Sequence, residues 1–192
     1  MIYNKTVILK DARMCIIRNG TEMDGEGTLN NFILTHEETD NLIQYPDEIK
    51  YTVEDEAKLM KAKKESPDMV ELLAVVEGKI VGIAGIDPIG RAYKLKHRAN
   101  LGISIEKAYW GLGIGRALME GCIECAKKAG YKQVELDVRA DNTNAIALYE
   151  SMGFVEYGRN PLGFNSRITG MEELVYMRLE LEEKNDRYFE TR

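Results

Sequence analysis

The sequence is poor in the residues that mark disulfide-bonded, disordered and metal-binding proteins. Its 192 residues include only three cysteines, four prolines and two histidines. An odd number of cysteines, in a chain long enough for a normal core, argues against a disulfide framework and favours a reducing compartment. Cys122 and Cys125 are spaced as in some metal and redox sites, but no second pair follows them. We interpret both as small apolar helix residues and predict no metal site.

Positive charge and long apolar runs are also scarce. The chain has 26 Lys and Arg against 32 Asp and Glu, a net charge of −6, which argues against nonspecific nucleic-acid binding. No run approaches the ~20 apolar residues of a membrane span. At the N-terminus, Lys5 and Lys10 precede any signal-like apolar run. We therefore expect a cytoplasmic protein that binds neither nucleic acid nor a membrane.

The length and the 44% hydrophobic content suit one folded domain. Strands and helices mix along the chain, which predicts an α/β (mixed α+β) architecture. We expect residues 1–181 to form this domain and the charged residues 182–192 to form a frayed tail. The predicted strands are 13–18, 72–76, 80–86, 99–105, 133–138, 154–157 and 174–181. The predicted helices are 24–44, 53–64, 113–129 and 142–152.

Three alternating glycines, Gly111, Gly113 and Gly115, stand where the strand 99–105 leads into a helix. Glycine lets the backbone approach a ligand closely and adopt positive φ angles. A helix N-terminus also offers unpaired N–H groups and a partial positive charge. The junction therefore favours a phosphate or pyrophosphate over a tight turn without a ligand. A Walker loop is excluded because no lysine follows the glycines, and the dinucleotide fingerprint fails because Arg116 occupies its third glycine position.

Two motifs resemble the GNAT superfamily of acyl-CoA-dependent N-acetyltransferases. Residues 110–115, WGLGIG, are similar to that family's pyrophosphate motif Gln/Arg-x-x-Gly-x-Gly/Ala, with Trp110 in place of the first residue. The family's second pattern, Asn-x-x-Ala-x-x-x-Tyr-x-x-x-Gly-Phe, begins at Asn142 and ends at Phe154. The resemblance covers residues 72–157 well, whereas the first 70 residues match only in outline.

The resemblance implies a fold and a cofactor site. It implies a single GNAT-like domain whose central sheet is mixed, mostly antiparallel, splayed at its middle strands and flanked by helices. The pantetheine of acetyl-CoA, the co-substrate, would enter the gap between the strands 99–105 and 133–138, and N–H groups of the glycine loop would hold its pyrophosphate. Asn142 would contact the pantetheine arm, although an asparagine there also suits a helix N-cap. The implied cofactor-binding residues are Ile103, Ser104, Ile105, Gly111, Leu112, Gly113, Ile114, Gly115, Arg116 and Asn142.

The implied reaction is direct attack of a primary amine on the thioester in a ternary complex. A tyrosine with a pKa of ~10 stays protonated at neutral pH. The resemblance therefore implies that Tyr149 is the catalytic residue that protonates the CoA thiolate; packing beneath the sheet is the alternative. The general base stays open, because alternation along the strand does not tell whether Asn100, Ser104 or Glu106 points into the cleft.

The partner that the sequence identifies least is the acceptor. Acidic residues gather in residues 22–56, which favours a cationic small-molecule amine or a peptide or protein amine; a solvated helix face is the alternative. A homodimer is one assembly state to test. A catalytically silent acyl-CoA-binding or sensor module is the alternative function, against which the presence of Tyr149 argues.

Overall fold

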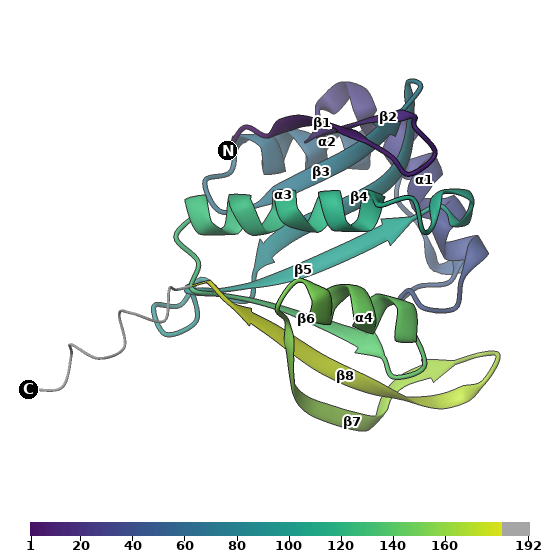
Figure 1. The fold of residues 1–192 in the computed structure, drawn as a ribbon, viewed down its shortest axis with the longest axis vertical. Coiled ribbons are helices and arrows are strands. Elements are labelled where there is room, and N and C mark those ends of the chain that lie inside the picture. Colours follow the sequence, from purple (N-terminus) through teal and green to yellow (C-terminus); the bar gives the residue numbers. More distant parts are fainter. Residues whose placement is uncertain (182–192) are drawn as a thin grey trace, which may run out of the picture.

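The computed structural model describes residues 1–181, which form one eight-stranded sheet with helices on both faces (Figure 1). The strand order is β1-β2-β3-β4-β5-β6-β8-β7, and every neighbouring pair is antiparallel except β5 and β6. This confirms the predicted mixed, mostly antiparallel α/β fold. The strands are β1 (Asn4–Ile8), β2 (Met14–Asn19), β3 (Val70–Val76), β4 (Lys79–Pro88), β5 (Arg98–Ile105), β6 (Gln133–Arg139), β7 (Val155–Ser166) and β8 (Gly170–Glu180).

Helices cover both faces of the sheet (Figure 1). α1 packs against β4 and β5, and α2 packs against β3, whereas α3 crosses β2 to β5 on the opposite face (Figure 1). The α-helices within residues 1–181 are α1 (Gly25–Glu38), α2 (Val53–Glu65), α3 (Ile114–Lys128) and α4 (Thr143–Ser151). Short 3-10 turns in the same range are η1 (Glu22–Asp24), η2 (Pro46–Glu48) and η3 (Lys107–Tyr109). None of the helices in this described range is long and apolar enough to cross a bilayer.

The N-terminal third departs most from the sequence prediction. β1 was not predicted, because its residues are mostly exposed and show no apolar alternation. The helix predicted over 24–44 ends at Glu38, where Thr39 turns the backbone to an extended conformation. At the other end, the strand predicted over 154–157 continues to Ser166, through a Pro161 that reads as a loop signal. The predicted tail, 182–192, lies outside the described residues.

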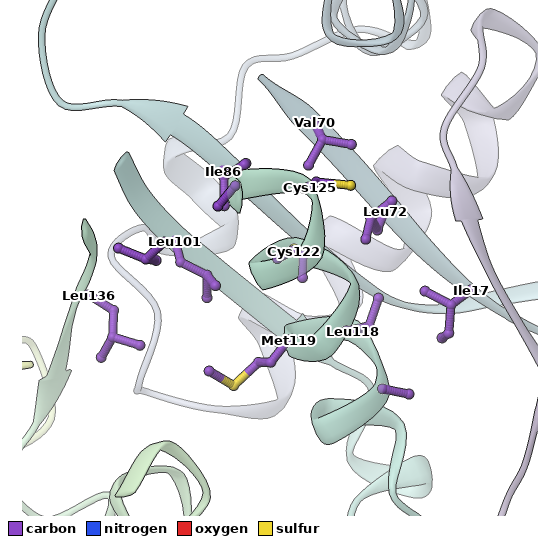
Figure 2. Packing of buried hydrophobic residues seen from close by; sticks show 14 of the residues in the cluster. Ile17, Val70, Leu72, Ile86, Leu101, Leu118, Met119, Cys122, Cys125 and Leu136 are labelled. Atoms are coloured by element: carbon purple, nitrogen blue, oxygen red, sulfur yellow. The ribbon is translucent and has the colours of Figure 1, made fainter. Parts of the chain in front are cut away.

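The main core lies between α3 and the middle strands. Leu118, Cys122 and Cys125 of α3 are fully buried, and they lie over Leu72 and Ile86 of the sheet (Figure 2). The cysteines are free thiols, and burial raises the pKa of the Cys122 thiol well above its usual value. Their interpretation as small apolar helix residues is confirmed.

The sheet is split at its centre. β5 and β6 pair only where Arg98–Asn100 runs beside Gln133–Glu135. Beyond that point β5 continues along β4 to Ile105, and β6 continues along β8 to Arg139. Backbone groups of the two diverging halves are therefore free of each other and available to a ligand. The predicted splaying of the middle strands is confirmed.

Candidate functional site

A cavity of about 720 Å³ lies where β5 and β6 diverge. Its wall combines the end of β5, the glycine loop, the first turn of α3, one side of α4 along its length, and the segment that follows α1. The structure brings together all but one of the predicted site residues here: Ile103, Ser104, Ile105, Gly111, Gly113, Ile114, Gly115, Arg116, Asn142 and Tyr149. The exception is Leu112, whose side chain packs against the hydrophobic core instead.

The glycines of the loop serve two different needs. Gly111 and Gly113 have φ angles of +74° and +101°, in the left-handed region that other residues adopt only with strain. A Cβ at either position would meet no atom within 4 Å, so conformation rather than crowding requires glycine there. At Gly115 a Cβ would lie 3.0 Å from Leu148 Cδ2 and 3.4 Å from Ile105 Cδ1. That glycine lets α3 approach α4 and β5 closely.

The N-terminus of α3 faces the cavity. Gly113 is its N-cap and supplies no capping side chain. The first amides of a helix have no partner within it, and here they belong to Ile114, Gly115 and Arg116, which all line the cavity. Such a set of N–H groups, at the positive end of a helix dipole, suits a phosphate.

Trp110 and Lys10 hold the glycine loop from two sides. The Trp110 indole N–H donates a hydrogen bond of 2.7 Å to the carbonyl of Ile105, which ties the loop to the end of β5. The backbone N–H of Lys10, in the β1–β2 turn, donates to the carbonyl of Leu112 at 3.2 Å. The Lys10 side chain is exposed and lines the cavity beside the glycines. Lys10 and Arg116 are the cationic residues of the range 1–181 that line the cavity. The Arg116 guanidinium donates a hydrogen bond of 2.7 Å to Ser151 Oγ.

Tyr149 is buried and lines the cavity as well, so its two predicted roles are compatible. Its side chain is 8% exposed and its ring centroid lies 6.1 Å from that of Phe154. Burial, and then the charge of Asp137, raise the pKa of Tyr149 to about 12. Asn142 likewise combines two features, because it lines the cavity while its Oδ1 accepts a hydrogen bond of 3.3 Å from the amide of Ala145 as the α4 N-cap.

The structure distinguishes the three residues that the sequence left open as general base by their position relative to the cavity. Ser104 lines the cavity, whereas Asn100 does not. Glu106 is only 2% exposed, and it accepts hydrogen bonds from Lys79 Nζ at 2.5 Å and Asn31 Nδ2 at 3.2 Å. It lines a second, smaller cavity of about 350 Å³ between α1 and the start of β4. Glu106 is therefore a paired, buried carboxylate outside the main cavity.

Sequence reasoning missed Lys10 and a stretch of cavity wall after α1. That stretch contributes Thr39, Asn41 and Leu42. No local pattern marks these residues, because only the packing of the β1–β2 turn and of the α1–α2 connection brings them to the cavity. The residues 1–181 contain no group of three or more His, Cys, Asp or Glu placed to hold a metal ion.

Comparisons with known proteins agree with the geometry. The family model described as "Acetyltransferase (GNAT) family" matches residues 32–154. An 81-residue stretch is 40% identical to N-alpha-acetyltransferase RimI of Mycobacterium tuberculosis and covers 42% of this chain and 49% of that protein. The matches to curated relatives thus cover about half of each relative's own length or less.

Solved structures share the fold over most of its length. The GNAT-family acetyltransferase of Streptococcus pneumoniae matches with a TM-score of 0.83 and 29% identity, over 86% of this chain and 99% of that one. A putative acetyltransferase of Salmonella typhimurium, solved with its cofactor acetyl-CoA, matches with a TM-score of 0.78 over 89% of this chain and 96% of that one. At 18% identity the latter shows the fold alone. With the family model spanning most of the chain, this protein belongs to the acetyltransferase (GNAT) family.

Proposed function

We propose that this protein is an N-acetyltransferase that transfers an acetyl group from acetyl-CoA to a primary amine by direct attack in a ternary complex. The observation that carries the proposal is the split between β5 and β6, because one cavity there joins the glycine loop to Tyr149. Its volume of about 720 Å³ falls within the usual range of small-molecule sites. Family membership supports acetyl-CoA as the co-substrate. We assign the activity to a single domain of residues 1–181, followed by the charged tail 182–192.

The cofactor's parts match distinct parts of the cavity. The amides of Ile114, Gly115 and Arg116 would hold the pyrophosphate, and the ammonium of Lys10 would add charge complementarity. The pantetheine would run along the β5 residues that β6 has left, 103–105. The same backbone groups would polarise the thioester carbonyl. Asn142 would contact the pantetheine arm from the start of α4.

The chemistry needs a proton donor for sulfur and an acceptor for the amine proton. A pKa of about 12 keeps Tyr149 protonated at neutral pH, so it can give its proton to the thiolate as the carbon–sulfur bond breaks. An alkylammonium must lose a proton before it attacks, which costs about 5 kcal/mol at neutral pH. No carboxylate among residues 1–181 lines the cavity, so we propose that solvent water accepts this proton. After the attack the nitrogen loses its second proton to solvent and Tyr149 regains a proton from solvent, so the products are the acetylated amine, the CoA thiol and one released proton.

The negative charge of the N-terminal region restricts the identity of the amine acceptor less than the sequence suggested. Several carboxylates of the acidic N-terminal region are already paired: Asp24 with Arg18, Asp40 with Arg139, and Asp47 with Arg167. Glu48, which also pairs with Arg167, is the fourth, so four of the eleven carboxylates in residues 22–56 are neutralised and the others can still attract a cationic amine. We propose a small-molecule amine or a peptide α-amine; the name of the Mycobacterium relative, an N-alpha-acetyltransferase, supports the second.

The remaining partners follow from composition. We propose a cytoplasmic protein without nucleic-acid or membrane partners, because its net charge is −6 and its three buried cysteines are free. A homodimer stays a hypothesis that light scattering after size-exclusion chromatography tests.

The decisive experiment combines an acetylation assay with ligand binding. The protein is incubated with acetyl-CoA and a panel of amino acids, polyamines, aminoglycosides and peptides with a free α-amine, and products are identified by mass. We expect an acetylated amine with stoichiometric thiol release. Acetyl-CoA at ~100 times its dissociation constant should stabilise the protein by about 2.7 kcal/mol. Stabilisation without any product would favour the silent module, and stabilisation by NAD alone would overturn the cofactor assignment.

A further inference from the structure

The connection between α1 and α2 forms part of the cavity wall but has little structure of its own. We call residues 39–48 the wall segment. Thr39, Asn41 and Leu42 from it line the cavity, and η2 is its regular element. Outside η2 the segment has no helix or strand bonding, so contacts with other elements hold it in position. Its polar contacts therefore decide the shape of this side of the cavity.

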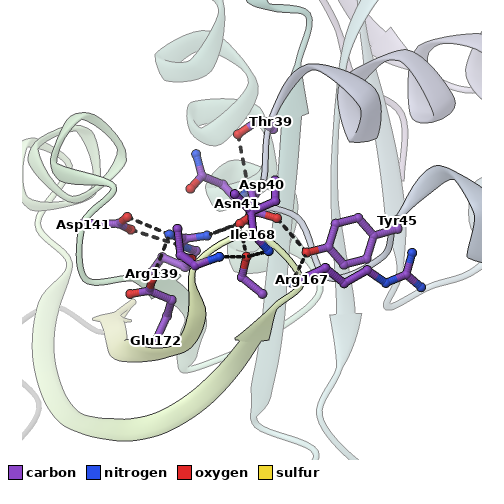
Figure 3. A network of polar contacts seen from close by, with 11 residues as sticks. Thr39, Asp40, Asn41, Tyr45, Arg139, Asp141, Arg167, Ile168 and Glu172 are labelled. Atoms are coloured by element: carbon purple, nitrogen blue, oxygen red, sulfur yellow. Dashed lines mark hydrogen bonds and ion pairs between the residues drawn. The ribbon is translucent and has the colours of Figure 1, made fainter.

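Arg139 makes the central contact with the wall segment. It is the last residue of β6, in the half that has left β5, and its side chain is only 4% exposed. Its Nη1 donates to Asp40 Oδ2 at 2.7 Å and to the Asp40 carbonyl at 3.0 Å, while Nε and Nη2 donate to the two carboxylate oxygens of Asp141 (Figure 3). One guanidinium thus joins β6, the start of α4 and the wall segment. Lysine could not reach both carboxylates with such a planar fork.

The β7–β8 turn holds the same segment from another side. Ser166 Oγ donates to Asp40 Oδ2 at 2.6 Å, and the Tyr45 hydroxyl donates to Asp40 Oδ1 at 2.9 Å. That hydroxyl accepts a hydrogen bond of 2.7 Å from the amide of Arg167 (Figure 3). The Arg167 guanidinium pairs with Asp47 at 2.7 Å. Asp40 is therefore the point at which both supports of the wall segment meet.

We propose that Arg139 is a positioning residue for the acceptor: by holding Asp40, it fixes the wall segment across the cavity and so sets the affinity for the amine. This inference rests on the proposed function. The glycine loop has its own supports in Trp110 and Lys10, neither of which touches Arg139. Loosening the wall segment should therefore leave acetyl-CoA binding intact. If the wall segment occupies its position only part of the time, only that fraction of the protein can bind the amine. The apparent affinity for the amine is then the intrinsic affinity multiplied by that fraction.

The test compares Arg139→Gln with Arg159→Gln. Arg159 is 48% exposed and pairs with Glu156 and Glu173 on β7 and β8, so its loss removes ion pairs that do not involve the wall segment. In Arg139→Gln we expect hydrogen exchange of the amides in residues 40–48 to quicken and the KM for the amine to rise about tenfold. The KM for acetyl-CoA and kcat should stay close to the wild-type values. Arg159→Gln should change none of these quantities.

Two further variants keep the proposal falsifiable. Arg139→Lys should recover part of the amine affinity, because one ammonium can still pair with Asp40. Asp40→Asn keeps the side-chain shape but removes the charge, and it should raise the same KM if Arg139→Gln fails to fold. Unchanged exchange in residues 40–48, together with an unchanged KM for the amine, would overturn the proposal. If the wild-type protein acetylates no amine, the proposed function is wrong and the inferred effect on amine affinity is wrong with it. Faster exchange in Arg139→Gln would still establish that Arg139 holds the wall segment.

Discussion

The two ends of α3 offer a matched pair of substitutions that separate cofactor binding from folding. Gly113 precedes the helix with a φ of +101°, and Gly130 follows it with a φ of +80°. A Cβ at either position would meet no atom within 4 Å. Gly113→Ala and Gly130→Ala therefore impose the same kind of backbone strain, without a clash, roughly 1–2 kcal/mol each. In a protein of this size such a loss lowers the Tm by about 2–8 °C.

Only one of the two substitutions places a methyl group at the cavity. Gly113 lines it, directly before the free amides of the first turn of α3, whereas Gly130 does not. A methyl group there would hold a phosphate away from those amides. Losing one hydrogen bond to a charged group costs about 1.5–3 kcal/mol. The dissociation constant of CoA should therefore rise roughly 10- to 150-fold in Gly113→Ala and stay at the wild-type value in Gly130→Ala.

Isothermal titration with CoA measures the affinity of each variant, and urea unfolding measures its stability. We expect similar losses of stability and very different losses of affinity. If Gly113→Ala binds CoA as tightly as Gly130→Ala does, the phosphates lie elsewhere and the assignment of the glycine loop is wrong. If Gly130→Ala also loses affinity, strain within α3 rather than contact at its N-terminus governs binding.

Three other changes address the chemistry, the charge at the loop and the acid stability. Tyr149→Phe should lower kcat by roughly 10²–10⁴ while leaving acetyl-CoA affinity unchanged, and an acyl donor with a more acidic thiol should partly rescue it; wild-type turnover in steady-state assays would remove Tyr149 from the mechanism. Lys10→Ala should weaken CoA binding about two- to fivefold and flatten its salt dependence, measured by titration against Lys5→Ala as an exposed β1 control; equal affinities would leave Lys10 without a role. The Arg18 guanidinium lowers the pKa of Asp24 from 3.8 to about 2. Because this folded-state pKa is depressed, the stabilisation is complete above pH 4 and is lost as the pH falls toward 2. Urea unfolding of Asp24→Asn should show a flatter decline over that range, and a wild-type decline would contradict the assignment.

The elements that the sequence predicted well are those whose signals are local. Glu77-Gly78 stands between the predicted strands 72–76 and 80–86, and both residues have positive φ angles, as a two-residue hairpin turn requires. α3 was predicted from apolar spacing, and its regular positions Leu118, Cys122 and Cys125 are all fully buried. In both cases the residues that carry the signal lie within a few positions of each other.

The features that the sequence could not predict join distant parts of the chain. Arg139 and Asp40 are 99 positions apart, and neither lies in a motif that indicates the other. Lys10 reaches the glycine loop only because the β1–β2 turn packs there, and β1 itself lacks an apolar face. Polar contacts between elements depend on how the whole sheet is assembled, which no local spacing encodes.

The choice among carboxylates illustrates why strand register, rather than position in the sequence, decides a chemical role. Glu106 follows the strand that leads to the glycine loop, so the sequence alone makes it a reasonable base. Antiparallel pairing of β4 with β5 brings Lys79 to Glu106, and α1 brings Asn31, so this carboxylate already accepts two hydrogen bonds from its neighbours. Asp137 is exposed on the strand that has left β5, and it does not line the cavity either. Neither carboxylate forms part of the cavity wall, because the register and alternation of each strand decide which side chains face the ligand.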